Sequence, residues 1–259
     1  MISIGPMDDG LSDLMSNASP QSWYRRIGNP LPSTESVVWF PHAGGGVSSL
    51  IRQLNRSPPG INVFAATLPG RERRFNETMP DTLDQLIATL VAELPQLPRP
   101  PVLIGHSFGA LLAYCVAQSA AASGLVVMAM SPPELISRRD SIVHLEDAEF
   151  VQQLDRRYGG IPQTLRENEE AMRLFLPPVR HDLSLMESYQ DDAAKIVDIP
   201  VRAYAGSRDT RVSAERMEGW RGRTTATFSL ETLSGDHFFP LLHVNRVLQS
   251  ARRCFDTTH

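Results

Sequence analysis

A serine flanked by glycines is the residue in this sequence that is best suited to chemistry. Ser107 lies in a G-x-S-x-G pentapeptide at residues 105–109. An apolar strand at residues 102–104 comes directly before the pentapeptide, and an apolar helix follows it. This setting holds a serine in a strained turn with its hydroxyl exposed, and the glycines leave room for the neighbouring backbone. We therefore expect Ser107 to be a nucleophile.

The serine needs a base, and one of the seven histidines is well placed to supply it. A serine hydroxyl is a poor nucleophile at neutral pH, so a histidine must take its proton and a carboxylate must orient that histidine. The expected chain order is serine, acid, histidine, and only His237, His243 and His259 come late enough. His237 follows the expected strand at residues 228–233, whereas His243 falls within the last helix and His259 ends the chain. We therefore assign the base to His237.

Two carboxylates compete for the role of the acid. Asp209 lies in the loop after the expected strand at residues 201–205, and Glu134 follows the expected strand at residues 125–130. A carboxylate at either position can reach the histidine in folds of this kind. Because Glu134 comes directly after two prolines, where an insertion begins, we favour Asp209. The alternative role for Asp209 is to cap the helix that follows its turn.

The chemistry also needs N–H donors for the oxyanion that forms when a serine attacks a carbonyl carbon. They are typically the N–H of the residue after the nucleophile and one from a glycine-rich loop after an earlier strand. These positions are Phe108 and Ala43, the latter in the loop at residues 42–46. That loop matches neither the G-x-x-x-x-G-K-[ST] nor the G-x-G-x-x-G pattern of phosphate-binding loops, so nucleotide binding is disfavoured.

Strands and helices alternate along most of the chain, which is the pattern of a parallel sheet covered on both faces. We predict an α/β domain over residues 35–259, preceded by a flexible extension over residues 1–34 that settles only near Trp23 and Tyr24 and is rich in Gly, Pro, Ser, Asn and Asp. The expected strands are residues 37–40, 62–66, 101–104, 125–130, 201–205 and 228–233, and the expected helices are one through residues 51–54 and others at residues 83–94, 108–122 and 241–255.

The stretch from about residue 135 to residue 195 lacks this alternation and is predicted to be a helical insertion. Apolar residues recur at helical spacing on both sides of a proline pair, Pro177 and Pro178. Insertions of this size often act as lids. We expect about half of the following candidates to line a chamber beneath the lid and the rest to pack within it: Phe150, Leu154, Met172, Phe175, Met186 and Tyr189.

Composition excludes several classes of protein. The 259 residues are 42% hydrophobic and 21% charged, which is ordinary for a globular domain. The formal net charge is -4, so no overall positive field is available to bind nucleic acid. The longest uncharged run, residues 100–133, is interrupted by polar residues and is interpreted as strand, turn, helix and strand, not as a membrane span. With two cysteines and no apolar leader, we expect a cytoplasmic protein without a cofactor or a metal site.

Four motifs occur in an order that is far more specific than any one of them. They are W-F-P-H-A-G-G at residues 39–45, L-P-G-R-E-R-R-F at residues 68–75, G-H-S-F-G at residues 105–109 and G-D-H-F-F at residues 235–239. Together they resemble the signatures of type II thioesterases, stand-alone α/β-hydrolases that serve polyketide and nonribosomal peptide synthases. The segment at residues 176–183 is similar to the lid region of that family. Phe108 stands where the family often has methionine.

The resemblance implies an α/β-hydrolase fold, a mostly parallel central sheet flanked by helices and carrying a helical lid. It also implies Ser107, Asp209 and His237 as the catalytic residues and Ala43 and Phe108 as the oxyanion donors. The implied substrate is an acyl thioester on the phosphopantetheine arm of a carrier protein, and the implied task is removal of stalled or wrong acyl groups. A carboxylesterase or acyltransferase would use the same residues, whereas a noncatalytic acyl-ligand receptor would be expected to lack one of them.

The implied partner is an acyl or peptidyl carrier protein, which is acidic and would dock on local positive charge. Candidate clusters are residues 71–74, Arg138 with Arg139, and Arg156 with Arg157. Arg71 has an alternative role in holding its own loop. We expect a monomer that binds neither nucleic acid nor membrane.

Overall fold

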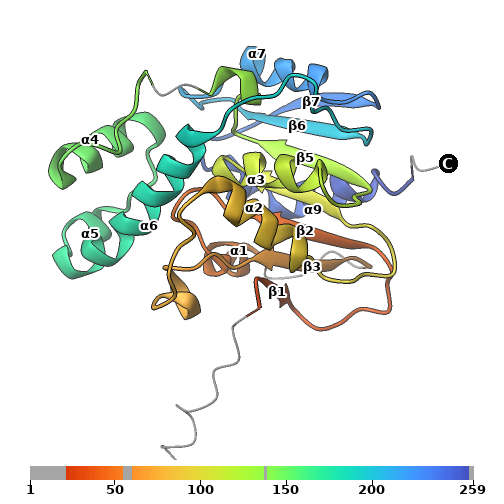
Figure 1. Ribbon diagram of the computed structural model, residues 1–259, viewed down its shortest axis with the longest axis horizontal. Helices are drawn as coiled ribbons and strands as arrows, with labels where there is room; N and C mark the ends of the chain where they lie inside the picture. Colours follow the sequence, from red (N-terminus) through yellow and green to blue (C-terminus); the bar gives the residue numbers. More distant parts are fainter. Residues whose placement is uncertain (1–21, 55–59, 137–138, 257–259) are drawn as a thin grey trace, which may run out of the picture.

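The computed structural model describes residues 22–54, 60–136 and 139–256, and its centre is a seven-stranded sheet. The strands lie in the order β1-β3-β2-β4-β5-β6-β7 (Figure 1). Every neighbouring pair is parallel except β1 with β3. The predicted fold class is therefore confirmed. The strands are β1 Tyr24–Ile27, β2 Ser36–Phe40, β3 Asn62–Ala66, β4 Val102–His106, β5 Gly124–Met128, β6 Val201–Gly206 and β7 Phe228–Leu233.

Helices cover both faces of the sheet (Figure 1). They are α1 Val47–Gln53, α2 Leu83–Ala92, α3 Phe108–Ala117, α7 Ala214–Met217, α8 Phe239–Leu242 and α9 Val244–Arg252, with short 3-10 turns η1 Glu72–Arg74, η2 Pro133–Leu135 and η3 Glu218–Arg223. In β2, Val38 and Phe40 join the apolar core on the side of α2 and α3, whereas Val37 and Trp39 join the core on the side of α1 and α9. Because the sheet is buried on both faces, its central strands are apolar at nearly every position.

The start of the sheet differs from the predicted domain boundary at residue 35. Residues 24–27 form the strand β1, beginning where the extension over residues 1–34 was expected to settle, near Trp23 and Tyr24. The strand pairs antiparallel with β3, and the hydroxyl of Tyr24 donates a 2.7 Å hydrogen bond to the carbonyl of Leu90 in α2. The ordered domain therefore begins before residue 35. Residues 1–21 of the expected extension lie outside the described residues.

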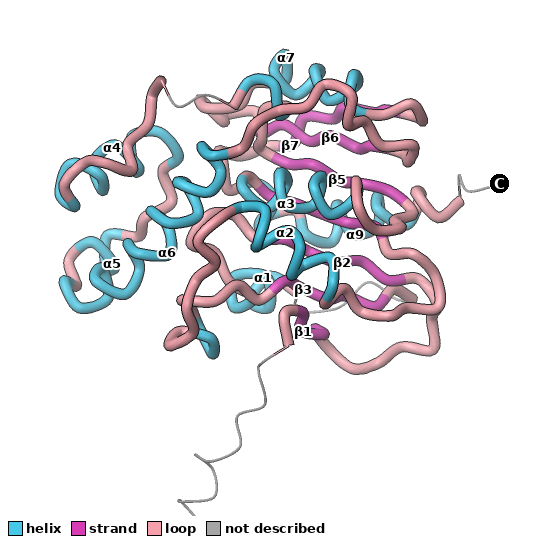
Figure 2. The backbone as a smooth tube through the Cα atoms, viewed as in Figure 1, coloured by secondary structure: helices cyan, strands magenta, loops and turns pink. Residues whose placement is uncertain are grey.

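The insertion between β5 and β6 is helical, as predicted, and lies to one side of the sheet (Figure 2). Its helices are α4 Asp147–Tyr158, α5 Gln163–Arg166 and α6 Glu169–Ser188. The helix α6 continues through Pro177 and Pro178. Its residues Leu176, Val179 and Leu183 are buried in a separate lid core, and this burial outweighs the missing proline N–H donors.

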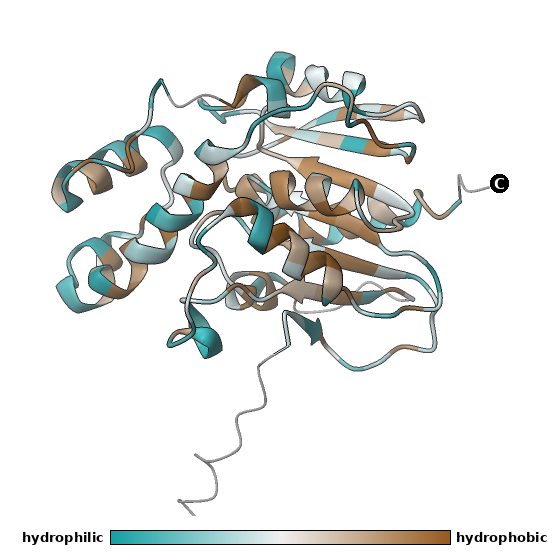
Figure 3. Cartoon of the chain, viewed as in Figure 1, coloured by the Kyte–Doolittle hydropathy of each residue, from teal (hydrophilic) through white to brown (hydrophobic). Residues whose placement is uncertain are grey.

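Hydropathy follows this architecture (Figure 3). The central strands are mostly hydrophobic, whereas the lid helices carry hydrophilic and hydrophobic residues side by side. Within the described residues, none of the helices combines the length and the apolar composition that crossing a bilayer requires.

We predict that Gly109→Ala destabilises the fold. A Cβ at Gly109 would lie 2.1 Å from the carbonyl oxygen of Phe40, so β2 and α3 would have to move apart. Overpacking of this kind costs about 1–3 kcal/mol. Gly222→Ala is the matched control, because nothing beyond its chain neighbours lies within 4 Å of its Cβ position. Thermal unfolding should give a lower Tm for Gly109→Ala alone, and an unchanged Tm there would contradict this account of the packing.

Candidate active site

Ser107 occupies a strained turn between β4 and α3. Its φ of 54° and ψ of -122° are rare for a residue with a side chain. The turn requires glycine at its start, because a Cβ at Gly105 would lie 2.2 Å from the carbonyl oxygen of Gly109. The N–H of Ser107 donates a 2.8 Å hydrogen bond to the carbonyl of Met128, which ties the turn to β5. The serine is therefore held firmly at the end of the sheet.

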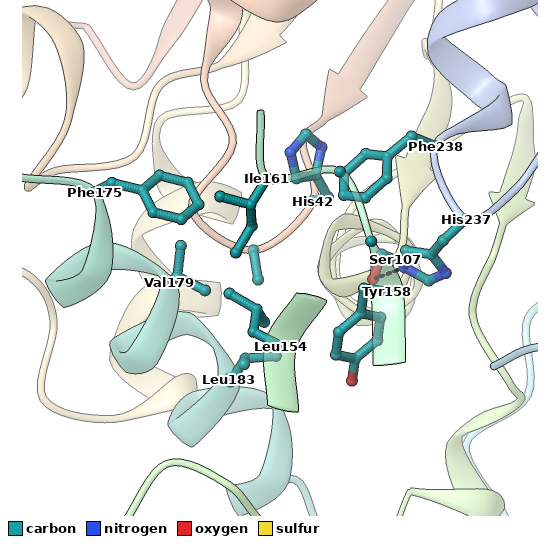
Figure 4. A pocket seen from close by; sticks show the side chains of 13 residues that line it. His42, Ser107, Leu154, Tyr158, Ile161, Phe175, Val179, Leu183, His237 and Phe238 are labelled. Carbon is teal, nitrogen blue, oxygen red and sulfur yellow. Dashed lines mark hydrogen bonds between the residues drawn. The ribbon is translucent and has the colours of Figure 1, made fainter. Parts of the chain in front are cut away.

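Three residues that are distant in sequence form one hydrogen-bonded row. The Oγ of Ser107 lies 3.0 Å from Nε2 of His237, and Nδ1 of His237 lies 2.9 Å from Oδ2 of Asp209 (Figure 4 shows the first of these contacts). A carboxylate can only accept, so Nδ1 carries the proton and Nε2 is free to accept from the hydroxyl of Ser107. The structure thus brings together the three residues that the sequence assigned as nucleophile, base and acid.

The carboxylate of Asp209 orients the histidine and also closes its own turn. Its Oδ1 accepts hydrogen bonds from the N–H groups of Arg211 at 2.9 Å and Val212 at 3.0 Å. Burial opposes the charged form, but the hydrogen bond and charge of His237 and these two N–H groups outweigh it, so the pKa of Asp209 is lowered. Asp209 is therefore a carboxylate at neutral pH. The alternative role of Asp209 as the cap of the following helix is wrong, because the side chain of Ser213 caps α7.

The alternative candidates for the acid and for the base are not part of this row. The carboxylate of Glu134 accepts hydrogen bonds from the guanidinium of Arg223 at 2.5 and 2.9 Å, and Arg223 also binds Asp191 at 2.5 Å. Glu134 is therefore directed toward η3 and is not brought to His237. The Nε2 of His243 lies 2.8 Å from the carbonyl of Ser234 in an exposed turn. His259 lies outside the described residues.

Two further histidines, which the sequence argument did not single out, support the row. The Nε2 of His106 donates a 2.8 Å hydrogen bond to the carbonyl of His237 and so fixes its backbone. The ring of His42 packs against His106 with 5.0 Å between centroids. Burial is the main cause that lowers the pKa of His106 well below its usual value and the pKa of His42 to about 4. Both rings are therefore neutral at pH 7.

The two N–H groups expected to bind the oxyanion are available. Phe108 is the first residue of α3, directly after Ser107, and Ala43 lines the same cavity as Ser107. Across residues 22–54, 60–136 and 139–256, no hydrogen bond uses the N–H of either residue. The helix N-terminus at Phe108 also favours negative charge.

A buried ion pair holds the glycine-rich loop against the lid. Asp182 of α6 accepts hydrogen bonds from both Nη atoms of Arg71, at 2.5 and 2.8 Å, and from the N–H of Gly44 at 2.8 Å. The side chains are only 8% and 2% exposed. Because Gly44 shares a peptide plane with the carbonyl of Ala43, this contact fixes the segment that carries the Ala43 N–H. Sequence reasoning missed Asp182, and its only signal was its place in the lid motif.

The rest of the L-P-G-R-E-R-R-F motif supports the same loop. The carboxylate of Glu72 accepts hydrogen bonds from the N–H groups of Val47 and Ser48, at 3.1 and 2.7 Å, and so caps the start of α1. The guanidinium of Arg74 donates to the carbonyl of Thr67 at 2.6 Å. The motif is therefore a scaffold for the glycine-rich loop.

An apolar cavity of about 80 Å3 lies above Ser107, between the sheet edge and the lid (Figure 4). Of the six lid candidates, Leu154 and Phe175 line it, and Met186 lines a neighbouring cavity that also reaches Ser107. The sequence argument missed several other lining residues, because their contacts depend on how the lid packs. They are Tyr158, Ile161, Val179, Leu183 and Phe238.

The remaining lid candidates lie outside this cavity. Phe150 is fully buried beneath the guanidinium of Arg180, and Met172 packs within the lid core. Tyr189 lines a different cavity, beside α2 and α3. The helical spacing correctly placed these side chains on the buried face of the insertion, but it did not separate packing positions from lining positions.

The arginine clusters expected to dock a carrier protein are largely committed to other contacts. Arg71 and Arg74 are buried, and Arg157 donates to the carbonyl of Asp140. Arg156 is exposed on α4. Arg138 lies outside the described residues. Within the described residues, no group of three or more His, Cys, Asp or Glu side chains is arranged to hold a metal.

Comparison with known proteins identifies the family. Residues 35–254 match the family model of the thioesterase domain. The chain belongs to the thioesterase family. It is 32% identical to linear gramicidin dehydrogenase LgrE of Brevibacillus parabrevis, over 86% of this chain and 88% of that protein. It is also 30% identical to thioesterase PikA5 of Streptomyces venezuelae, over 88% and 84% of the respective chains.

The structural comparison agrees with the motifs. The fold superposes on YbtT, the type II thioesterase of the yersiniabactin NRPS/PKS pathway, with a TM-score of 0.79 and 29% identity. The match covers 90% of this chain and 98% of YbtT. The resemblance to type II thioesterases that the four sequence motifs indicated is confirmed.

We predict that Asp182→Asn lowers kcat by up to about 10²-fold, the scale of losing one oxyanion donor, with little change in KM. Without the carboxylate charge, Arg71 no longer holds the loop that carries Ala43. The Ala43 N–H then stabilises the oxyanion of the transition state less well. Asp147→Asn is the control, because it breaks an exposed lid ion pair with Arg180. Steady-state kinetics on one acyl thioester make the comparison. Equal kcat values for the two variants would remove Asp182 from this role.

We predict that stability falls as the pH is lowered from 6.5 toward 4, and that His42 contributes to this fall. Its folded-state pKa of about 4 lies below the ordinary 6.5, so the unfolded chain binds the proton first in this window. In His42→Gln, the free energy of unfolding should depend less steeply on pH there, as measured by urea denaturation. His144→Gln, at an exposed histidine, is the control. An unaltered slope in His42→Gln would refute the assignment.

Proposed function

We propose that this protein hydrolyses acyl thioesters carried on the phosphopantetheine arm of carrier proteins, and so removes stalled or wrong acyl groups from a synthase. The observation that carries the proposal is the row Ser107, His237 and Asp209 at the base of an apolar cavity. Membership of the thioesterase family and the likeness to YbtT support it. These two findings favour a thioester over a simple ester as the substrate.

In the first half-reaction, the Oγ of Ser107 attacks the thioester carbonyl while Nε2 of His237 takes its proton. The new C–O bond gives a tetrahedral oxyanion, which the N–H groups of Ala43 and Phe108 stabilise. Asp209 remains ionised and stabilises the imidazolium that forms. The C–S bond then breaks, His237 protonates the departing thiolate, and the acyl group remains on Ser107 as an ester.

Water completes the cycle. His237, neutral again after protonating the thiol, takes a proton from a water molecule that attacks the acyl ester. A second oxyanion forms in the same position, and its collapse returns the proton to Oγ of Ser107 and releases a carboxylic acid. No cofactor or metal takes part in either half-reaction.

The apolar cavity accounts for the acyl side of the substrate. Leu154, Ile161, Phe175 and Val179 contribute aliphatic and aromatic surface that suits an acyl group. The lid also contacts the base directly, because the ring of Tyr158 lies 4.9 Å from the ring of His237. The lid therefore forms one wall of the space in which His237 exchanges protons.

We predict that Ser107→Ala lowers kcat on an acyl carrier protein by about 10⁴- to 10⁶-fold. The same assay should show that Asp209→Asn lowers it by about 10⁴-fold, because the histidine then adopts the wrong tautomer. Intact-mass spectrometry of the carrier protein follows the loss of the acyl group. Near-normal turnover in either variant would exclude that residue from catalysis.

The same assay tests the substrate class. A short acyl group is presented on a carrier protein, on coenzyme A and as a p-nitrophenyl ester. The proposal expects the highest kcat/KM on the carrier protein, with dependence on Ser107 throughout. Turnover confined to the free ester would leave the chemistry intact and contradict the carrier-protein assignment.

A further inference from the structure

The lid is joined to the rest of the domain by two chain segments, one at each end of the insertion (Figure 1). The first segment leaves the sheet after β5 and passes through η2, which contains Glu134. The second segment follows the end of α6, contains Asp191 and leads into β6. The two carboxylates therefore stand at the entry and at the exit of the insertion.

One arginine from outside the lid binds both of these carboxylates. Arg223 lies at the end of η3, in the connection between β6 and β7. Its Nε and Nη2 donate to Oε2 of Glu134 at 2.9 and 2.5 Å, and its Nη2 also donates to Oδ2 of Asp191 at 2.5 Å. A single guanidinium therefore links the two ends of the insertion to each other and to η3.

The turn η3 is itself fixed to the sheet and to the exit segment. The Nε1 of the fully buried Trp220 donates a 2.7 Å hydrogen bond to the carbonyl of Met130, just before the entry segment. The carbonyl of Arg223 accepts a 3.0 Å hydrogen bond from the N–H of Val197, and the carbonyl of Val197 accepts one of 3.0 Å from the N–H of Thr225. Arg223 thus binds the ends of the lid from a rigid support.

Burial makes the two ion pairs of Arg223 different from pairs on the surface. The side chain of Arg223 is 6% exposed, and that of Asp191 is 19% exposed. Exposed pairs contribute little to stability, whereas removal of one partner from a buried pair leaves charge without compensation. The two carboxylates bind the same Nη2 atom, so without the guanidinium they would be left close together and would repel each other.

The lid held in this way supplies one wall of the apolar cavity. Leu154 of α4 and Phe175 of α6 are part of that wall. The ion pair between Arg71 and Asp182 holds α6 within the helix, whereas Arg223 holds the two ends of the insertion. The position of the wall therefore depends on contacts that lie outside the cavity.

We infer that Arg223 is a positioning residue for the reaction: it fixes both ends of the lid and so sets the lid wall of the acyl cavity relative to Ser107. The inference rests on the proposed function, because it takes the apolar cavity as the binding site of the acyl group. It also gives Glu134, the alternative acid of the sequence analysis, a role in holding the lid.

Hydrogen exchange followed by mass spectrometry tests whether Arg223 holds the lid. In Arg223→Met, peptides from α4 and α6 should exchange about tenfold or more faster than in the unaltered chain, because a buried ion pair is broken. Peptides from β4 and α3 should exchange at an unchanged rate. Glu134→Ala alters an exposed side chain and removes the entry contact alone, so it should accelerate exchange in α4 more than in α6.

The effect on the cavity wall is tested with two substrates that differ by two methylenes, acetyl-pantetheine and butyryl-pantetheine. The unaltered chain should have a kcat/KM about tenfold higher on the butyryl substrate, as expected for burial of two methylenes. In Arg223→Met, this ratio should fall toward one. Partial unfolding would lower both kcat/KM values equally, so a loss of stability alone leaves the ratio unchanged.

Arg221→Met is the matched control. Arg221 belongs to the same turn, η3, and pairs with Glu218, but its side chain is 63% exposed. Its variant should keep both the exchange rates of the lid and the preference for the butyryl substrate.

Other results would overturn the inference in distinguishable ways. Unchanged exchange in α4 and α6, or an equal rise across the whole domain, would show that Arg223 does not hold the lid. A retained butyryl preference in Arg223→Met, or equal kcat/KM values in the unaltered chain, would remove the link to the cavity wall but leave the thioesterase function standing. Hydrolysis of neither substrate, nor of an acyl carrier protein, would refute the proposed function, and the exchange rates would still decide whether Arg223 holds the lid.

Discussion

The close packing of β2, β4 and α3 around Ser107 is the constraint on which the rest of the site depends. The carbonyl of Phe40 and the backbone of α3 approach so closely that positions 105 and 109 have no room for a Cβ. This approach holds the serine in a backbone conformation that a free chain rarely adopts. Because β6 and β7 end at the same edge of the parallel sheet, the loops after them bring Asp209 and His237 within hydrogen-bond distance.

The lid is part of this site and not a separate cover. Asp182 of α6 fixes the glycine-rich loop through Arg71 and Gly44, and Tyr158 at the end of α4 packs on the ring of His237. Any displacement of α6 would therefore disturb the segment that carries the Ala43 N–H.

The sheet and the row of three residues could be predicted from the sequence because both follow from local sequence patterns. Each residue comes just after a strand, and the ends of parallel strands meet at one edge. The roles of Asp182 and Tyr158 could not be predicted from the sequence, because they arise only when the insertion packs on the sheet. The same packing stabilises α6 at Pro177, where the intrinsic helix propensity of proline is unfavourable. The strand β1 was missed because its pairing with β3 leaves little periodic signal in four residues.

Covalent capture of the acyl group tests the central claim most directly. The protein is mixed with a butyryl thioester and the reaction is quenched with acid within milliseconds. The protein is then digested, and the masses of the peptides are measured by mass spectrometry. The account predicts a butyryl adduct on the peptide that contains Ser107, formed and lost at rates that match turnover, and absent in Ser107→Ala. Turnover without any adduct on Ser107, retained in the Ser107→Ala variant, would contradict it.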